Sequence, residues 1–126
     1  MEKSRVLLAD DYVPFRKALR EILLSQPELE LVGEAESGQD ALDKARSLRP
    51  DIVLVDITLP DINGLDVAGL IKQCLPEADI IVLTDDSDEE YRTAVAGSGA
   101  SGLLAKGSAR KELLPMMRGI HRARSE

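Results

Sequence analysis

Residues 52–64 read Ile-Val-Leu-Val-Asp-Ile-Thr-Leu-Pro-Asp-Ile-Asn-Gly, and this stretch decides the fold. It opens with an unbroken apolar run, Ile52–Val55, which ends at the carboxylate of Asp56. Strands without a polar face are typical of parallel sheets, because helices cover such sheets on both sides. The stretch therefore predicts a buried parallel strand with an acid at its carboxyl end.

Four further apolar runs flank this stretch, and segments of helical spacing separate them. Apolar residues between Phe15 and Leu23, and between Val67 and Cys74, each fall on one stripe of a helix. Strand and helix patterns alternate five times, which predicts an α/β fold with a doubly wound sheet of five parallel strands and five helices. The four runs are Val6–Ala9, Leu29–Val32 (broken by Glu30), Ile80–Leu83 and Leu103–Ala105.

Local signals mark several helix ends. Ser37 with Asp40, and Ser87 with Glu90, resemble the capping pairs that begin helices. Pro115 falls within the last helical pattern, where it removes a backbone donor at a cost of about 3 kcal/mol. We therefore expect the last helix to be kinked or to start late.

The composition indicates one globular domain. The chain has 126 residues, of which 44% are hydrophobic and 31% charged, and its net charge of −7 argues against direct binding to nucleic acid. Cys74 is the only cysteine, which excludes an internal disulfide, and we expect it to be buried in a helix. Since no segment resembles a signal peptide or reaches membrane-spanning length, we expect a cytoplasmic protein without membrane contact.

Polar residues follow the predicted strands at their carboxyl ends, where open parallel sheets bind ligands. Asp10 and Asp11 follow the first strand, Asp56 the third, Thr84 the fourth and Lys106 the fifth. Three crowded carboxylates repel one another and favour a hard divalent cation, for which Mg²⁺ is the best candidate. An aspartate can accept a phosphoryl group, whose charge a metal ion, an ammonium and a hydroxyl would stabilise. Each residue alone has a structural explanation, but five at the strand ends indicate a site.

These residues, together with the stretch from Asp56 to Gly64, resemble the receiver domains of two-component response regulators. The resemblance covers essentially the whole chain, residues 1–126. It implies a flavodoxin-like sheet of strand order 2-1-3-4-5 and phosphorylation on Asp56 with the help of Mg²⁺. It also implies that the protein is not an enzyme, beyond catalysing its own phosphorylation and dephosphorylation.

The same resemblance implies a role for each remaining site residue. Asp11 would be the chief metal-binding carboxylate, with Asp10 assisting. The backbone carbonyl of Thr58 would be a further metal ligand. Thr84 would supply the hydroxyl of the switch, and Lys106 would pair with the phosphoryl group.

The residues after the last strand, Lys106-Gly107-Ser108, look most like those of NarL/FixJ-type regulators. We therefore expect a sensor histidine kinase or another phosphodonor as partner, and a DNA-binding output domain outside this chain, with residues 122–126 beginning a linker. In this family phosphorylation alters the face made by the fourth helical pattern (91–95), the strand Leu103–Ala105 and the last helical pattern (113–120). That face could also form a homodimer.

Two positions depart from the family pattern. Leu103 stands three residues before the lysine, where receivers usually carry tyrosine or phenylalanine, and Asp85 follows Thr84 where a small or apolar residue is usual. Both leave open a receiver-like interaction module that works without phosphorylation. Two hypotheses remain open for Asp85. In the first, it is simply part of a solvated acidic turn before the next helix. In the second, its charge slows phosphorylation or changes the lifetime of the phosphoryl group.

Two other classes of protein fit the sequence poorly. Magnesium-dependent phosphatases with an aspartate nucleophile typically need a second aspartate two residues later, where this chain has Thr58. A flavodoxin-like carrier of FMN should welcome phosphate after its first strand, but Asp10 and Asp11 would repel it.

Overall fold

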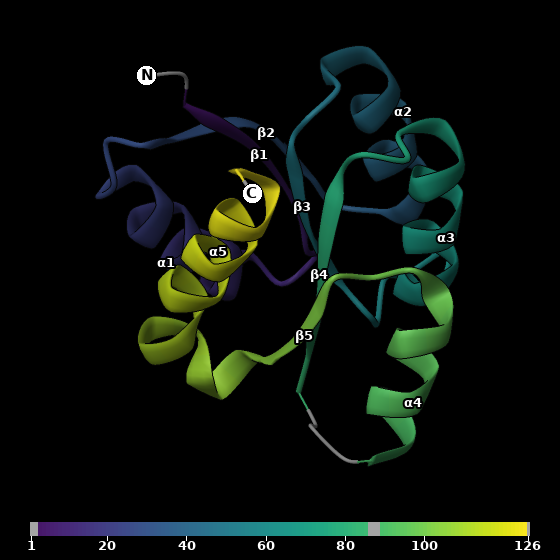
Figure 1. Cartoon of the computed structure of the whole chain (residues 1–126). Coiled ribbons are helices and arrows are strands. Elements are labelled where there is room, and N and C mark those ends of the chain that lie inside the picture. Colours follow the sequence, from purple (N-terminus) through teal and green to yellow (C-terminus); the bar gives the residue numbers. More distant parts are fainter. Residues whose placement is uncertain (1–2, 86–88, 126) are drawn as a thin grey trace.

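The computed structural model describes residues 3–85 and 89–125, and a sheet of five parallel strands lies at its centre (Figure 1). The strands follow the order β2-β1-β3-β4-β5, as the resemblance implied. This order places the carboxyl ends of β1 and β3 side by side at the point where the winding reverses, which is where such sheets bind ligands. The strands are β1 (Ser4–Ala9), β2 (Leu29–Ala35), β3 (Ile52–Asp56), β4 (Asp79–Thr84) and β5 (Gly102–Ala105).

In the described part of the chain, five helices cover the two faces of the sheet. One face carries α1 and α5, and the other carries α2, α3 and α4 (Figure 1). A short 3-10 turn, Lys106–Ser108, leads from β5 into α5. The helices are α1 (Val13–Leu24), α2 (Gly38–Leu48), α3 (Gly64–Cys74), α4 (Glu89–Ser98) and α5 (Ala109–Ser125).

The core consists of two aliphatic layers, one on each side of the sheet. Val53 and Val55 of β3 belong to the layer that includes residues of α2 and α3, whereas Ile52 and Leu54 belong to the layer with α1 and α5. All four are at most 2% exposed. Successive strand residues point to opposite faces, so a strand buried on both sides must be apolar throughout. This confirms the interpretation of Ile52–Val55.

The predicted signals at helix ends have different outcomes. The Ser37 hydroxyl accepts a 3.0 Å hydrogen bond from the backbone N–H of Asp40, which confirms this helix start. Ser87 of the second pair lies outside the described residues. Helix α5 runs from Ala109 with Pro115 inside it, so the expected late start is wrong, while a bend at Pro115 stays a prediction. Pro115 is exposed, so water can reach the carbonyl that lacks its usual donor.

The expected burial of Cys74 is wrong. Cys74 is the last residue of α3 and is exposed, because Ile71 and Leu75 occupy the inward positions of this turn.

The last helix, α5, continues to Ser125 and so includes most of the segment 122–126.

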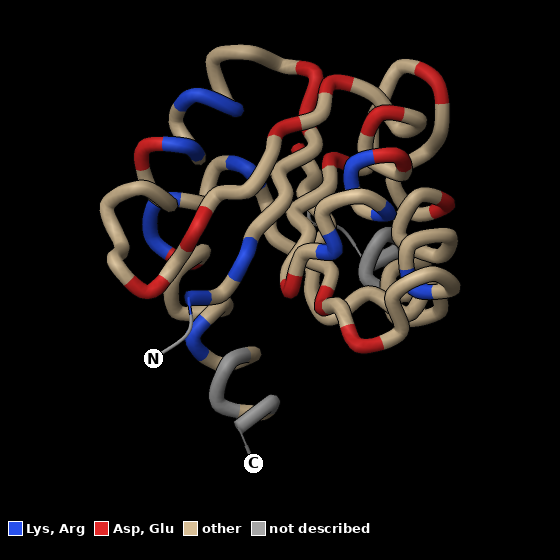
Figure 2. Tube along the Cα trace, turned by 90° about the horizontal axis from the view of Figure 1, so that it is seen from above, with Lys and Arg blue, Asp and Glu red and all other residues tan. Residues whose placement is uncertain are grey.

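None of the helices that the structure describes is both long enough and apolar enough to span a membrane. Acidic and basic residues are interspersed along the trace (Figure 2).

Candidate functional site

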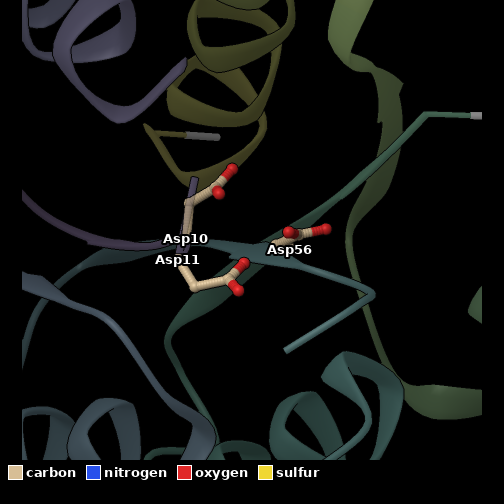
Figure 3. Close-up of side chains that lie close together, drawn as sticks. All are labelled: Asp10, Asp11 and Asp56. Carbon is tan, nitrogen blue, oxygen red and sulfur yellow. The ribbon is translucent and has the colours of Figure 1, made fainter. Parts of the chain in front are cut away.

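Three carboxylates lie close together at the carboxyl ends of β1 and β3 (Figure 3). Ala9 of β1 pairs with Val55 of β3, so the residues that follow them lie side by side. One ligand oxygen from each of Asp10, Asp11 and Asp56 lies within 4.8 Å of the other two. The structure thus brings together the three acids that the sequence singled out.

The three acids differ in their exposure to solvent. Asp10 is completely buried and Asp56 is 4% exposed, whereas Asp11 faces solvent. Burial raises the pKa of Asp56, a hydrogen bond from the backbone N–H of Thr58 lowers it, and the nearby charge of Asp10 raises it, so the net shift is upward. The ionised form of Asp56 is therefore held in an unfavourable setting, which a cation would relieve.

Lys106 supplies a fixed positive charge to this cluster. Its Nζ lies 2.8 Å from Oδ2 of Asp10 and 3.1 Å from Oδ2 of Asp56. Burial lowers the pKa of Lys106, but the hydrogen bond and charge of Asp10, helped by Asp56, outweigh burial and raise it above its ordinary value. Phe15, which the sequence indicated only as part of a core stripe, covers the ammonium with its ring centroid 4.7 Å from Nζ.

The strand register brings Thr84 to the same edge. Asp56 pairs with Leu83 in the β3–β4 ladder, so Thr84 follows directly beside the end of β3. Thr84 in turn pairs with Ala105, the residue before Lys106. Thr84 is 2% exposed. The hydroxyl and the ammonium thus come from neighbouring strand ends, as the sequence predicted.

A comparison with protein families decides what this arrangement is. The family model described as the response regulator receiver domain matches residues 6–118. The chain belongs to this family. Receiver domains are regulatory domains of two-component signalling.

The receiver spans about half the length of the curated relatives it matches. It is 36% identical over 104 residues to the transcriptional regulatory protein DegU of Brevibacillus brevis, a match that covers 82% of this chain and 44% of DegU. It is 31% identical over 116 residues to the response regulator GacA of Pseudomonas aeruginosa, which covers 92% of this chain and 54% of GacA.

Solved structures agree with this assignment. The signal receiver domain of the response regulator NarL from Mycobacterium tuberculosis superposes with a TM-score of 0.86 at 27% identity, covering 98% of this chain and 97% of that one. A LuxR-family response regulator from Aurantimonas gives a TM-score of 0.88 at 29% identity, covering 94% and 85%. The family and the flavodoxin-like strand order are therefore both confirmed.

This receiver departs from the family pattern at two positions, Leu103 and Asp85, which differ in burial. Leu103 is partly buried and packs against the core layer that includes residues of α2 and α3. Asp85 is exposed and directly follows the buried Thr84 in the chain. The Leu103 side chain has no polar group, so it can act on its neighbours only through packing.

The loop after Asp56 packs tightly against the end of β3. The N–H of Gly64 donates to the carbonyl of Ile57 at 2.8 Å, and the side chain of Asp56 accepts from the N–H of Thr58 at 3.1 Å. A Cβ on Gly64 would lie 2.1 Å from the carbonyl oxygen of Asp56. A glycine is therefore required here by close approach of two backbone segments. The carbonyl of Thr58 as a metal ligand stays a prediction.

A contact that the sequence did not predict anchors this loop to α2. Asp61 accepts hydrogen bonds from the backbone N–H groups of Gly38 at 2.7 Å and Gln39 at 3.0 Å. These two N–H groups belong to the first turn of α2, which has no partners for them within the helix. Because 22 or 23 residues separate the partners, no local pattern could reveal the contact.

Replacing Asp61 with alanine is expected to lower the melting temperature by a few degrees, because the start of α2 loses two hydrogen bonds. The N–H groups of Gln39 and Gly38 lower the pKa of Asp61, so its contribution is present at neutral pH and is lost as the pH falls through that lowered pKa. Thermal melts from neutral to strongly acidic pH measure this difference. Asp43→Ala, an exposed carboxylate on the same helix, is the control. An Asp61 variant that melts like this control would contradict the anchoring role.

Proposed function

We propose that this receiver accepts a phosphoryl group on Asp56 while Mg²⁺ is bound by the neighbouring acids, and that phosphorylation switches its protein contacts. The observation that carries the proposal is the position of Asp56. It lies beside Asp10 and Asp11, and one of its oxygens is 3.1 Å from the ammonium of Lys106. An acceptor, a metal site and a fixed cation thus meet at one point.

The donor groups fit Mg²⁺. All are hard oxygen ligands, and three carboxylates without a cation repel one another. Asp11 and Asp56 would hold the ion, with Asp10 and the carbonyl of Thr58 as the remaining candidates. When bound, the ion supplies positive charge for the phosphoryl oxygens. Asp11 is exposed, so an ion can enter from its side of the cluster.

The residues divide the phosphoryl transfer among them. A carboxylate oxygen of Asp56 attacks the phosphorus of the donor, the bond from phosphorus to the leaving group breaks, and the leaving group departs with the bonding electrons. The product is an aspartyl phosphate. Lys106 stands where its ammonium can pair with a phosphoryl oxygen, and the Thr84 hydroxyl at the next strand end can donate to another.

The partners follow from the family and from the names of the relatives. DegU is called a transcriptional regulatory protein, and the receiver covers only 44% of it. We infer that the phosphodonor is a sensor histidine kinase or a small phosphodonor, and that the output is a DNA-binding domain outside this chain. The face of α4, β5 and α5 would carry the changed contacts, including a homodimer.

Intact mass measurement tests the reaction. The protein is incubated with Mg²⁺ and a small acyl phosphate, then weighed with and without a chelator. One phosphoryl group per chain is expected, and the chelator should prevent its addition. No adduct with any donor, while Mg²⁺ still binds, would favour the interaction module that works without phosphorylation.

Mg²⁺ is expected to raise the melting temperature of the receiver, because a ligand that binds only the folded state stabilises it. At one hundred times its dissociation constant the gain is about 2.7 kcal/mol. Asp11→Asn should lose most of this gain, since it removes the exposed ligand of the cluster. Asp43→Asn, an exposed acid on α2, should keep it. Equal gains in both variants would show that the ion binds elsewhere.

Asp85→Ala is expected to phosphorylate several-fold faster than the wild type, because an exposed carboxylate next to Thr84 repels the incoming anion. The rate of adduct formation and the lifetime of the adduct are both measured by intact mass. Since salt screens exposed charges, the difference should shrink as ionic strength rises. Unchanged rate and lifetime would support the solvated acidic turn instead.

A further inference from the structure

Arg16 of α1 is a buried cation that contacts both the backbone beside the carboxylate cluster and two acids at the end of β2. It is 8% exposed, and its Nη1 donates a 2.8 Å hydrogen bond to the backbone carbonyl of Asp10. The rest of the guanidinium faces two acids of the neighbouring β2 strand and the loop after it. Nε lies 3.1 Å from Glu34, and Nη2 lies 3.1 Å from Glu36.

The carbonyl of Asp10 belongs to the peptide group that leads into Asp11. The peptide group containing this carbonyl joins the two acids, so its orientation sets the direction of the Asp11 backbone. The other polar groups of Asp10 have separate partners. Its N–H donates to Ala35 at 3.0 Å, Oδ1 accepts from the N–H of Tyr12 at 2.8 Å, and Oδ2 lies 2.8 Å from Lys106.

We propose that Arg16 is a positioning residue of the metal site, which ties the end of β2 to the Asp10–Asp11 peptide and so aims the Asp11 carboxylate at the ion. The proposal rests on the proposed binding of Mg²⁺. A guanidinium suits this task because its planar fork offers several donors in fixed directions. Its two acidic partners keep the buried charge paired while one donor reaches the carbonyl.

Two roles of Arg16, as a positive charge and as a positioning group, predict opposite changes in Mg²⁺ affinity when Arg16 is removed. A positive charge near a cation site repels the ion, so loss of charge alone would tighten Mg²⁺ binding. Loss of a group that orients a ligand would weaken it, and removing such supporting contacts typically costs about 10–100-fold in metal affinity. The direction of the change therefore separates the two explanations.

Arg20 provides a matched control on the same helix. It forms hydrogen bonds of 2.7 and 2.8 Å to Glu34, one of the acids that also faces Arg16. Within residues 3–85 and 89–125, Arg20 forms no hydrogen bond or ion pair with Asp10. Arg16, Arg20, Glu34 and Glu36 form one ion-pair cluster. Replacing Arg20 with methionine removes one arginine from this ion-pair cluster, as the same change at Arg16 does. Its side chain is 38% exposed, so the loss of buried packing is smaller.

The test measures the Mg²⁺ dissociation constant of the whole chain by calorimetry, with thermal melts to establish that each variant is folded. Arg16→Met is expected to weaken binding at least tenfold, whereas Arg20→Met should stay within about twofold of the wild type. Arg16→Lys keeps the charge but cannot bridge the carbonyl and both glutamates, so it should also weaken binding, by several-fold. If Arg16→Met does not fold, Arg16→Lys carries the test.

Binding by a folded Arg16 variant that is unchanged or tighter would overturn the positioning role and leave the proposed function intact. An equal weakening in Arg20→Met would also overturn it, because the effect would then belong to the whole ion-pair cluster. A wild-type chain that binds no Mg²⁺ at all would overturn both this inference and the metal-dependent function.

Discussion

Replacing Asp56 with asparagine is expected to abolish the phosphoryl adduct completely and to raise the melting temperature by a few degrees. The amide keeps the shape of the side chain but is no longer a nucleophile. The Asp56 carboxylate both pairs with Lys106 and accepts the N–H of Thr58 in the loop after β3. Intact mass with a small acyl phosphate measures the first effect, and thermal melts measure the second. Asp43→Asn should resemble the wild type in both.

The gain in stability has a defined pH dependence. The pKa of Asp56 is raised in the folded state, chiefly by burial, so folding favours the protonated carboxyl. Its contribution to stability is therefore present at low pH and is lost as the pH rises through the folded pKa. The asparagine variant has no such loss, so its advantage should grow from acidic to neutral pH. A constant advantage, or a residual adduct, would contradict this account of Asp56.

Replacing Gly64 with alanine is expected to destabilise the fold by about 3 kcal/mol or more. The added Cβ would lie 2.1 Å from the carbonyl oxygen of Asp56 and 2.6 Å from the Cα of Ile57, so backbone must move. No flexible side chain can yield in its place. Since the displaced backbone carries the acceptor, phosphorylation and Mg²⁺ binding should fall together with stability.

Gly69→Ala is the control for this substitution. It lies in the same helix, α3, and a Cβ there would meet nothing within 4 Å. Alanine is favoured over glycine in a helix interior by about 1 kcal/mol, so this variant should be slightly more stable than the wild type. Denaturant unfolding of both variants gives the comparison. A Gly64 variant as stable as the Gly69 variant would show that the loop can shift without cost.

Much of the fold was predictable from the sequence, because a strand buried on both faces is apolar at every position. Ile52–Val55 is apolar at every position, and the structure buries all four residues in two opposite layers. The site was predictable for a related reason. In a parallel sheet all carboxyl ends meet at one edge, so residues such as Asp10, Asp56 and Lys106 are brought together by topology alone.

Other features depend on contacts between segments far apart in the chain, which no local pattern records. The sequence indicated neither that Asp61 would bond to the start of α2 nor that Phe15 would cover Lys106. It placed Cys74 inside the core, whereas neighbouring residues occupy the inward positions of that turn.

From the sequence alone one could predict the apolar strands, the resemblance to receivers and the residues that meet at the edge of the sheet. The full burial of Asp10, the exposure of Asp11 and the contact of Arg16 with the carbonyl between them became visible only in the folded chain. The physical reason is range. The apolar pattern of a segment shows which of its faces is buried, because that pattern depends on the segment alone. The exposure and orientation of a single side chain depend also on which distant groups pack around it.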